Sequence, residues 1–90
     1  MNTQELKQAL RNGPYAWPGG YPLYFITRGG DVLSFQAVKD NYRLVLADMR
    51  AGYPNGWGTE WVGVNWEDDD LFCDHTGERI PSAYAEEVAA

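Results

Sequence analysis

Residues 23–35 constrain the fold most, because their pattern is compatible with little other than a β-hairpin. Residues 23–27 are LYFIT, and these residue types are enriched in strands. Residues 28–31 are RGGD, whose two glycines can adopt the positive φ angles of a tight turn. Residues 32–35 then return as a second strand, so the sequence predicts an antiparallel hairpin.

The apolar spacing changes directly after this hairpin, from every second residue to every third or fourth. Residues 35–51 carry an apolar stripe at helical spacing, which indicates one buried helix face. The stripe consists of Val38, Tyr42, Val45, Leu46 and Met49. Ser34 is a suitable N-cap, and Gly52 is a suitable residue just past the C-terminal end. The pattern predicts one long central helix.

The N-terminal segment predicts a short helix followed by a loop. Residues 3–12 have a short apolar stripe preceded by a capping box, and NGP at residues 12–14 ends the helix. Residues 15–22 are YAWPGGYP, with two prolines and two glycines. We expect an irregular loop there, pinned over the core by its rings.

The C-terminal half predicts a strand and a second, smaller hairpin. Residues 60–66 alternate, with Val62, Val64 and Trp66 on one face, as in a strand covered on one side. Residues 71–73 and 78–80 can then pair across a turn.

Together these elements predict an α+β fold. A small antiparallel sheet of two hairpins plus a strand would pack on the long central helix, with the short helix at the N-terminus. Ninety residues leave room for one hydrophobic core. We assign residues 1–84 to a single domain and residues 85–90 to a polar tail.

The charge balance restricts the class of partner. Thirteen acidic and seven basic side chains give a formal net charge of −6. Such a surface repels phosphate backbones, which argues against nucleic acid as a direct ligand and favours a basic protein surface. The alternative is that the charge only keeps the protein soluble. No secretory signal or membrane-spanning run is recognisable, so we expect a cytoplasmic protein.

The acidic run after the second strand is the main candidate site. Four successive carboxylates suit a basic partner, although a solvated loop or a cation site are alternatives; the run lacks the spacing of an EF-hand. Aromatic residues in Pro/Gly-rich loops are common interface anchors, although they can also cap the ends of a sheet. The predicted partner-binding residues are Glu67, Asp68, Asp69, Asp70, Asp74, Glu78, Trp57 and Tyr53.

The segment CDHTGER at residues 73–79 has the appearance of half a zinc site. Structural zinc needs four ligands, and Cys73 and His75 are the only Cys and His in the chain. They are also two residues apart on a turn, which does not align a thiol with an imidazole, and no third orienting group is evident. We therefore expect no metal, no cofactor, no catalytic residue and no enzymatic activity.

Three segments carry a resemblance to a known family: NGPYAWPGGYPLYF, NWEDDDLFCDH and GERIPSAYAE. Over residues 15–84 the chain resembles a family of small proteins from phages and other mobile elements of proteobacteria. In that family two C-x-x-C pairs together resemble a zinc ribbon. The first pair falls here on Ser34 and Ala37, and the second on Cys73 and Thr76. The resemblance implies a degenerate zinc-ribbon-like backbone whose metal has been lost.

Composition and resemblance lead to one functional expectation. The chain would be a non-enzymatic, acidic inhibitor from a phage or mobile element that occludes a basic nucleic-acid-binding surface of a bacterial defence complex. Its partner would be a CRISPR effector complex or another nuclease in the host cytoplasm, with no membrane involved. The alternative is a zinc-ribbon-derived structural or regulatory adaptor of phage replication or transcription.

Overall fold

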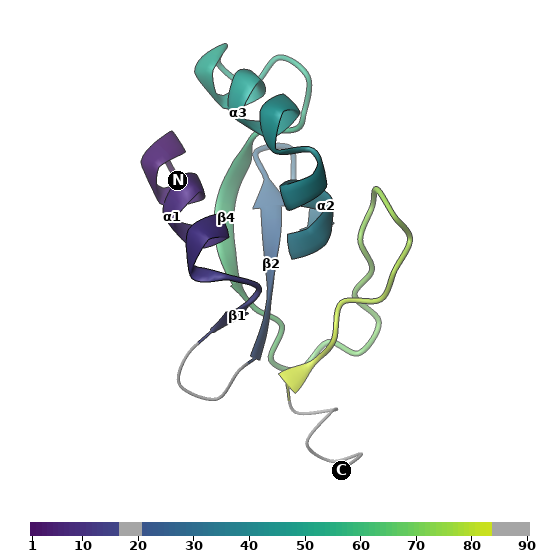
Figure 1. Ribbon diagram of the computed structural model, residues 1–90. Coiled ribbons are helices and arrows are strands. Elements are labelled where there is room, and N and C mark those ends of the chain that lie inside the picture. The colour runs from purple at the N-terminus through teal and green to yellow at the C-terminus, as the bar shows by residue number, and fades with distance from the viewer. Residues whose placement is uncertain (17–20, 84–90) are drawn as a thin grey trace.

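The computed structural model describes residues 1–16 and 21–83. Helices and strands are interspersed along this part of the chain, so the α+β class is confirmed (Figure 1). The elements are α1 (Thr3–Asn12), β1 (Tyr15–Ala16), β2 (Tyr21–Thr27), β3 (Val32–Ser34), α2 (Phe35–Asp40), α3 (Tyr42–Arg50) and β4 (Thr59–Val64). The predicted tail at residues 85–90 lies outside the described residues.

Strand β2 is the centre of the sheet. It pairs with β3 on one edge, where Phe25 is opposite Leu33, and with β4 on the other, where Phe25 is opposite Val62. Both pairings are antiparallel. The predicted hairpin is confirmed, except that Phe35 already belongs to α2.

The expectation of an irregular loop at residues 15–22 is wrong at both ends. Strand β1 pairs antiparallel with the first two residues of β2, Tyr21 and Pro22. The N–H of Leu23 extends this pairing by donating to the carbonyl of Pro14 at 2.9 Å. A proline lacks a donor but keeps its acceptor, so it can take part at the margin of a sheet. The intervening residues, with Trp17, lie outside the described part.

The predicted second hairpin forms around its turn, but through a single bridge between Phe72 and Arg79. The N–H of Cys73 donates to the carbonyl of Glu78, and that of Ile80 to the carbonyl of Leu71, both at 2.8 Å.

The prediction of a single long central helix is wrong, because the helix is interrupted at Asn41, between α2 and α3. The Asn41 side-chain amide donates to the carbonyl of Ala37 at 2.8 Å, and its backbone N–H donates there too at 3.1 Å. A short amide that bonds the preceding turn competes with the regular helix pattern. Val38 and Val45 are both fully buried, so the apolar stripe continues across the break.

The predicted helix ends are confirmed. Asn2 and Glu5 form a reciprocal capping box at the start of α1. The Ser34 hydroxyl accepts from the N–H of Ala37 at 3.0 Å and caps α2. Gly52 follows α3 with a φ of 88°, a left-handed conformation that favours glycine.

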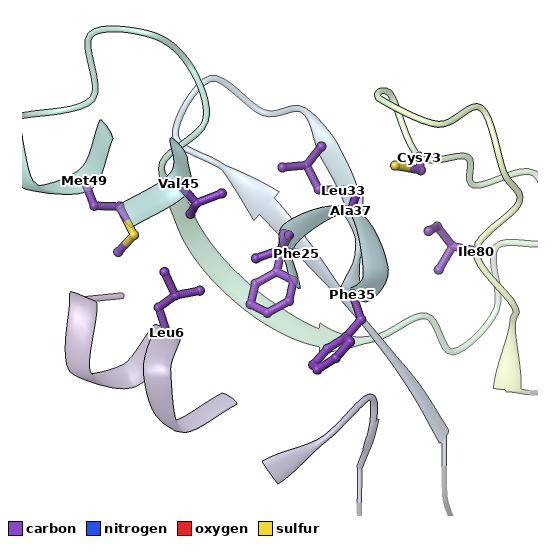
Figure 2. Close-up of a cluster of buried hydrophobic side chains, with 10 residues drawn as sticks. Leu6, Phe25, Leu33, Phe35, Ala37, Val45, Met49, Cys73 and Ile80 are labelled. Atoms are coloured by element: carbon purple, nitrogen blue, oxygen red, sulfur yellow. The ribbon is translucent and has the colours of Figure 1, made fainter. Parts of the chain in front are cut away.

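The hydrophobic core lies between one face of the sheet and the three helices (Figure 2). Alternate residues of a strand point to opposite faces, so Phe25 and Leu33 point into the core from neighbouring strands. Leu6 of α1 closes one end of the core, and Cys73 and Ile80 of the C-terminal segment close the other.

A buried carboxylate fixes the loop that follows α3. Asp48 is only 2% exposed. One carboxylate oxygen accepts from the N–H of Asn55 and the other from the N–H of Gly58, both at 2.6 Å. Hydrogen bonds to backbone N–H groups satisfy a buried carboxylate without a cation. The sequence reading did not identify this residue.

This loop leads to a prediction for Gly58. A Cβ added there would overlap the ring of Tyr53 and lie 3.1 Å from the Asp48 carboxylate. Gly58→Ala should therefore destabilise the protein by about 1–3 kcal/mol in urea unfolding, as overpacking usually does.

The matched control is Gly29→Ala, because no atom lies within 4 Å of a Cβ at that position. Its unfolding free energy should stay within about 0.5 kcal/mol of the parent value. Equal effects of the two substitutions would contradict the close packing at Gly58.

Candidate functional site

The acidic run forms a loop with a defined conformation directly after β4. Its four side chains, residues 67–70, are exposed. The buried Asn65 holds the loop: its amide N–H₂ donates to the carbonyls of Asp68 at 2.6 Å and Ile80 at 3.2 Å. Its amide oxygen accepts from the N–H of Asp68 at 3.1 Å. The loop is therefore anchored to the C-terminal segment.

The face of the sheet opposite the core carries aromatic side chains. The strand register places Tyr24 and Trp61 there, because their neighbours Phe25 and Val62 are on the core side. The two rings meet edge to face with centroids 5.2 Å apart. The Trp61 ring also lies over Gly63, where a Cβ would overlap it. Trp61 remains 44% exposed.

The aromatic face and the acidic loop adjoin each other. Burial raises the pKa of the Tyr24 phenol, and the negative charge of Asp68 raises it further. Trp66, at the start of the loop, is 47% exposed and meets Tyr21 edge to face at 5.1 Å. We call Tyr24, Trp61, Trp66 and the loop at residues 67–70 the aromatic–acidic surface.

Three of the other predicted site residues lie around a separate pocket of about 230 Å³ or beside it. Trp57 and Asp74 line this pocket, and the Trp57 ring meets His75 at 5.0 Å. Tyr53 carries the guanidinium of Arg28 above its ring at 4.8 Å. None of the four acidic-loop residues lines the pocket, so the structure does not join the predicted residues into one site.

Asp74 and Glu78 belong to the C-terminal hairpin. Asp74 makes a reciprocal contact with Val32: its carboxylate accepts from the Val32 N–H at 2.7 Å, and its own N–H donates to the Val32 carbonyl at 2.8 Å. This pair fastens the hairpin to β3. Glu78 is exposed, and its backbone N–H donates to the Thr76 hydroxyl.

The environment of Cys73 brings together positions that are far apart in the sequence. Its sulfur is buried and accepts from the N–H of Ser34 at 3.3 Å. Burial raises the pKa of the Cys73 thiol, but hydrogen bonds outweigh this effect and lower the pKa overall. The donors are the Thr76 hydroxyl and the backbone N–H groups of Ser34, Thr76 and His75.

Within residues 1–16 and 21–83, no three His, Cys, Asp or Glu side chains are grouped so that they could hold a metal ion. No helix in the same part of the chain is both long and apolar enough to cross a membrane.

The electrostatic effect of Asp68 on Tyr24 predicts how the Tyr24 phenol titrates. Because burial is the larger cause of the raised pKa, Asp68→Asn should lower the pKa of Tyr24 without returning it to the ordinary value. NMR of the tyrosine rings at alkaline pH measures this change. Asp40→Asn, on α2, is the control and should leave the Tyr24 pKa unchanged. If the pKa of Tyr24 were the same in the parent and in Asp68→Asn, the acidic loop would exert no electrostatic effect on the aromatic face.

Comparisons of the chain with protein-family models, with curated proteins and with solved structures find no match in any of the three. The argument for a binding surface therefore rests on the geometry of the chain, and a target class can be proposed only from the sequence resemblance.

Proposed function

We propose that the chain is a non-enzymatic inhibitor that uses its aromatic–acidic surface to occlude a basic protein surface. The observation that carries this proposal is the position of exposed Trp61, packed on half-buried Tyr24, beside an acidic loop that Asn65 holds in place. The resemblance to phage and mobile-element proteins suggests the target class: a CRISPR effector complex or another nuclease in the cytoplasm of a bacterial host.

The chemistry of nucleic-acid-binding surfaces favours this pairing. Such surfaces are rich in arginine, whose guanidinium both pairs with carboxylates and stacks on aromatic rings. The acidic loop offers carboxylates that can pair with arginine, and exposed Trp61 offers a ring on which a guanidinium can stack. Since the loop is already ordered in the free protein, less conformational entropy is lost on binding.

The surroundings of the two most reactive side chain types also support a binding role. The Cys73 sulfur is 1% exposed, so a substrate cannot reach it, although hydrogen bonds lower the pKa of its thiol. The His75 ring packs against Trp57. This arrangement favours a binding protein over an enzyme that uses either side chain.

The acidic loop gives the central prediction. Asp68→Asn, Asp69→Asn and Asp70→Asn together should leave stability nearly unchanged and slow association with a purified CRISPR effector complex. The loss should be greatest at low salt, because exposed charges are screened beyond about 8 Å at physiological ionic strength. Surface plasmon resonance across a salt series measures both rates.

A second triple variant controls for net charge. Asp31→Asn, Asp40→Asn and Glu60→Gln remove the same number of charges from positions outside the acidic loop. This variant should associate faster than the loop variant. If the loop variant and the parent gave superimposable curves at every salt concentration, the loop would serve solubility only.

One observation supports the alternative function, a zinc-ribbon-derived adaptor: the arrangement of residues around Cys73. Ser34 and Thr76 both donate hydrogen bonds to the Cys73 sulfur. Ala37 is bonded in turn to the Ser34 hydroxyl at 3.0 Å. The four positions that the resemblance assigns to a zinc site are therefore linked in space, and we propose that they descend from one.

This proposal predicts that metal binding can be restored. The parent protein should carry no stoichiometric zinc. Ser34→Cys, Ala37→Cys and Thr76→Cys together should bind about one zinc ion per chain, since four thiolates complete a tetrahedral site. Elemental analysis measures the content, and a chelator should lower the melting temperature of this variant alone.

Adding Cys73→Ser to the triple variant is the control, because it removes one of the four thiolates and should weaken zinc binding. A parent protein that already held about one zinc per chain would contradict the loss of the metal. A folded triple variant without zinc would contradict the zinc-ribbon origin.

A further inference from the structure

A groove between α1 and the corner of α2 and α3 collects basic side chains that the proposed function does not use. Its volume is about 400 Å³. It is lined by Lys7, Leu10, Arg11, Lys39 and Tyr42. The three residues from α1 are spaced i, i+3 and i+4, which places them on one face of that helix. Lys39 is in the last turn of α2, and Tyr42 begins α3.

The three cations of this groove have no salt-bridge partner among the described residues. Three of the seven basic side chains of the protein line the groove, although the chain has thirteen acidic side chains that could pair with them. Within residues 1–16 and 21–83, Arg28 forms a salt bridge with Glu60, whereas Lys7, Arg11 and Lys39 form none. The nearby acids are engaged locally: Glu5 accepts from the N–H of Asn2, and Asp40 accepts from Gln36.

The floor of the groove is apolar. Leu10 and Tyr42 are half-buried and pack against the hydrophobic core. Lysine and arginine side chains can lay their apolar stems along such a floor while their charged ends reach its rim. The guanidinium of Arg11 can also bond two oxygens of a carboxylate or phosphate at once. The groove thus combines an apolar floor with a cationic rim.

Size and charge restrict the ligand. A volume of about 400 Å³ is within the range of small-molecule pockets, roughly 300–1,000 Å³. The net charge of −6 opposes the approach of nucleic acids and anionic membranes, which carry many charges, far more than that of a small anion with one or two.

We propose that this groove binds a small amphiphilic anion, a carboxylate or phosphate ester with an apolar tail. The tail would lie on Leu10 and Tyr42, and the head group would lie between Lys7, Arg11 and Lys39. The site is independent of the aromatic–acidic surface, so either proposal can fail without the other.

Titration of the full chain with octanoate and octyl phosphate, followed by NMR of the backbone amides, tests the site. Both anions should shift the signals of the residues that line the groove. Acetate has the head group without the tail, and octylammonium has the tail with the opposite charge. Each should bind at least about tenfold more weakly, a difference that the titration resolves.

The next test replaces three partly or fully exposed cations with glutamine: Lys7→Gln, Arg11→Gln and Lys39→Gln. These changes should leave the fold intact. Together they should weaken octanoate binding by about tenfold or more. Each of the three changes alone should also weaken binding, and the control for these single variants is Arg50→Gln, which removes one cation from α3 outside the groove and should leave the affinity unchanged.

Three results would overturn the proposal. Octylammonium binding as tightly as octanoate would show an apolar effect without a role for the cations. An equal loss in Arg50→Gln would show an effect of net charge. Self-association that needs no added anion, and that the groove substitutions abolish, would instead assign the groove to the acidic loop of a second copy.

Discussion

The hydrogen bonding of β2 on both edges is the constraint on which the rest of the structure depends. Because neighbouring residues of this strand point to opposite faces, Phe25 belongs to the core and Tyr24 to the aromatic face. A single step along the chain therefore leads from the fully buried Phe25 to the half-buried Tyr24, which supports exposed Trp61 on the other face. Tyr24 and Trp61 of the aromatic–acidic surface lie on the side of the sheet away from the helices, and Trp66 and the acidic loop follow directly after β4.

The acidic residues serve two different purposes. Asp48 is buried, and backbone N–H groups satisfy it, so its charge organises the chain and is hidden from a partner. The side chains of the loop at residues 67–70 are exposed to solvent, and the Asp68 carboxylate also accepts from the N–H of Asp70 at 2.9 Å. The basic residues of the α1 groove are separated from both. The net charge of −6 thus conceals a molecule with an acidic surface and a basic groove in different places.

Features set by neighbouring residues could be predicted from the sequence. The hairpin around Gly29 and Gly30, the capping box at Asn2 and the cap at Ser34 each depend on a few adjacent side chains. The break at Asn41 could not, because the apolar stripe continues through it and only a side-chain hydrogen bond reveals it. The division of the predicted site residues also escaped prediction, since it depends on long-range pairing with β2 and β3. For Trp61 a signal existed: if Val62 and Val64 face the core, alternation puts Trp61 on the other face.

The reciprocal hydrogen bonds between Asp74 and Val32 limit how β3 can recognise another protein. The outward groups of a short edge strand such as β3 are those of alternate residues, here Val32 and Ser34. The N–H and carbonyl of Val32 are bonded to Asp74, and the N–H of Ser34 is bonded to the Cys73 sulfur. These groups are no longer available to template an incoming strand, the usual route to β-augmentation and to edge-to-edge aggregation. At this edge, recognition must use side chains, so its specificity would lie in the partner's surface chemistry rather than in an extended segment of its backbone.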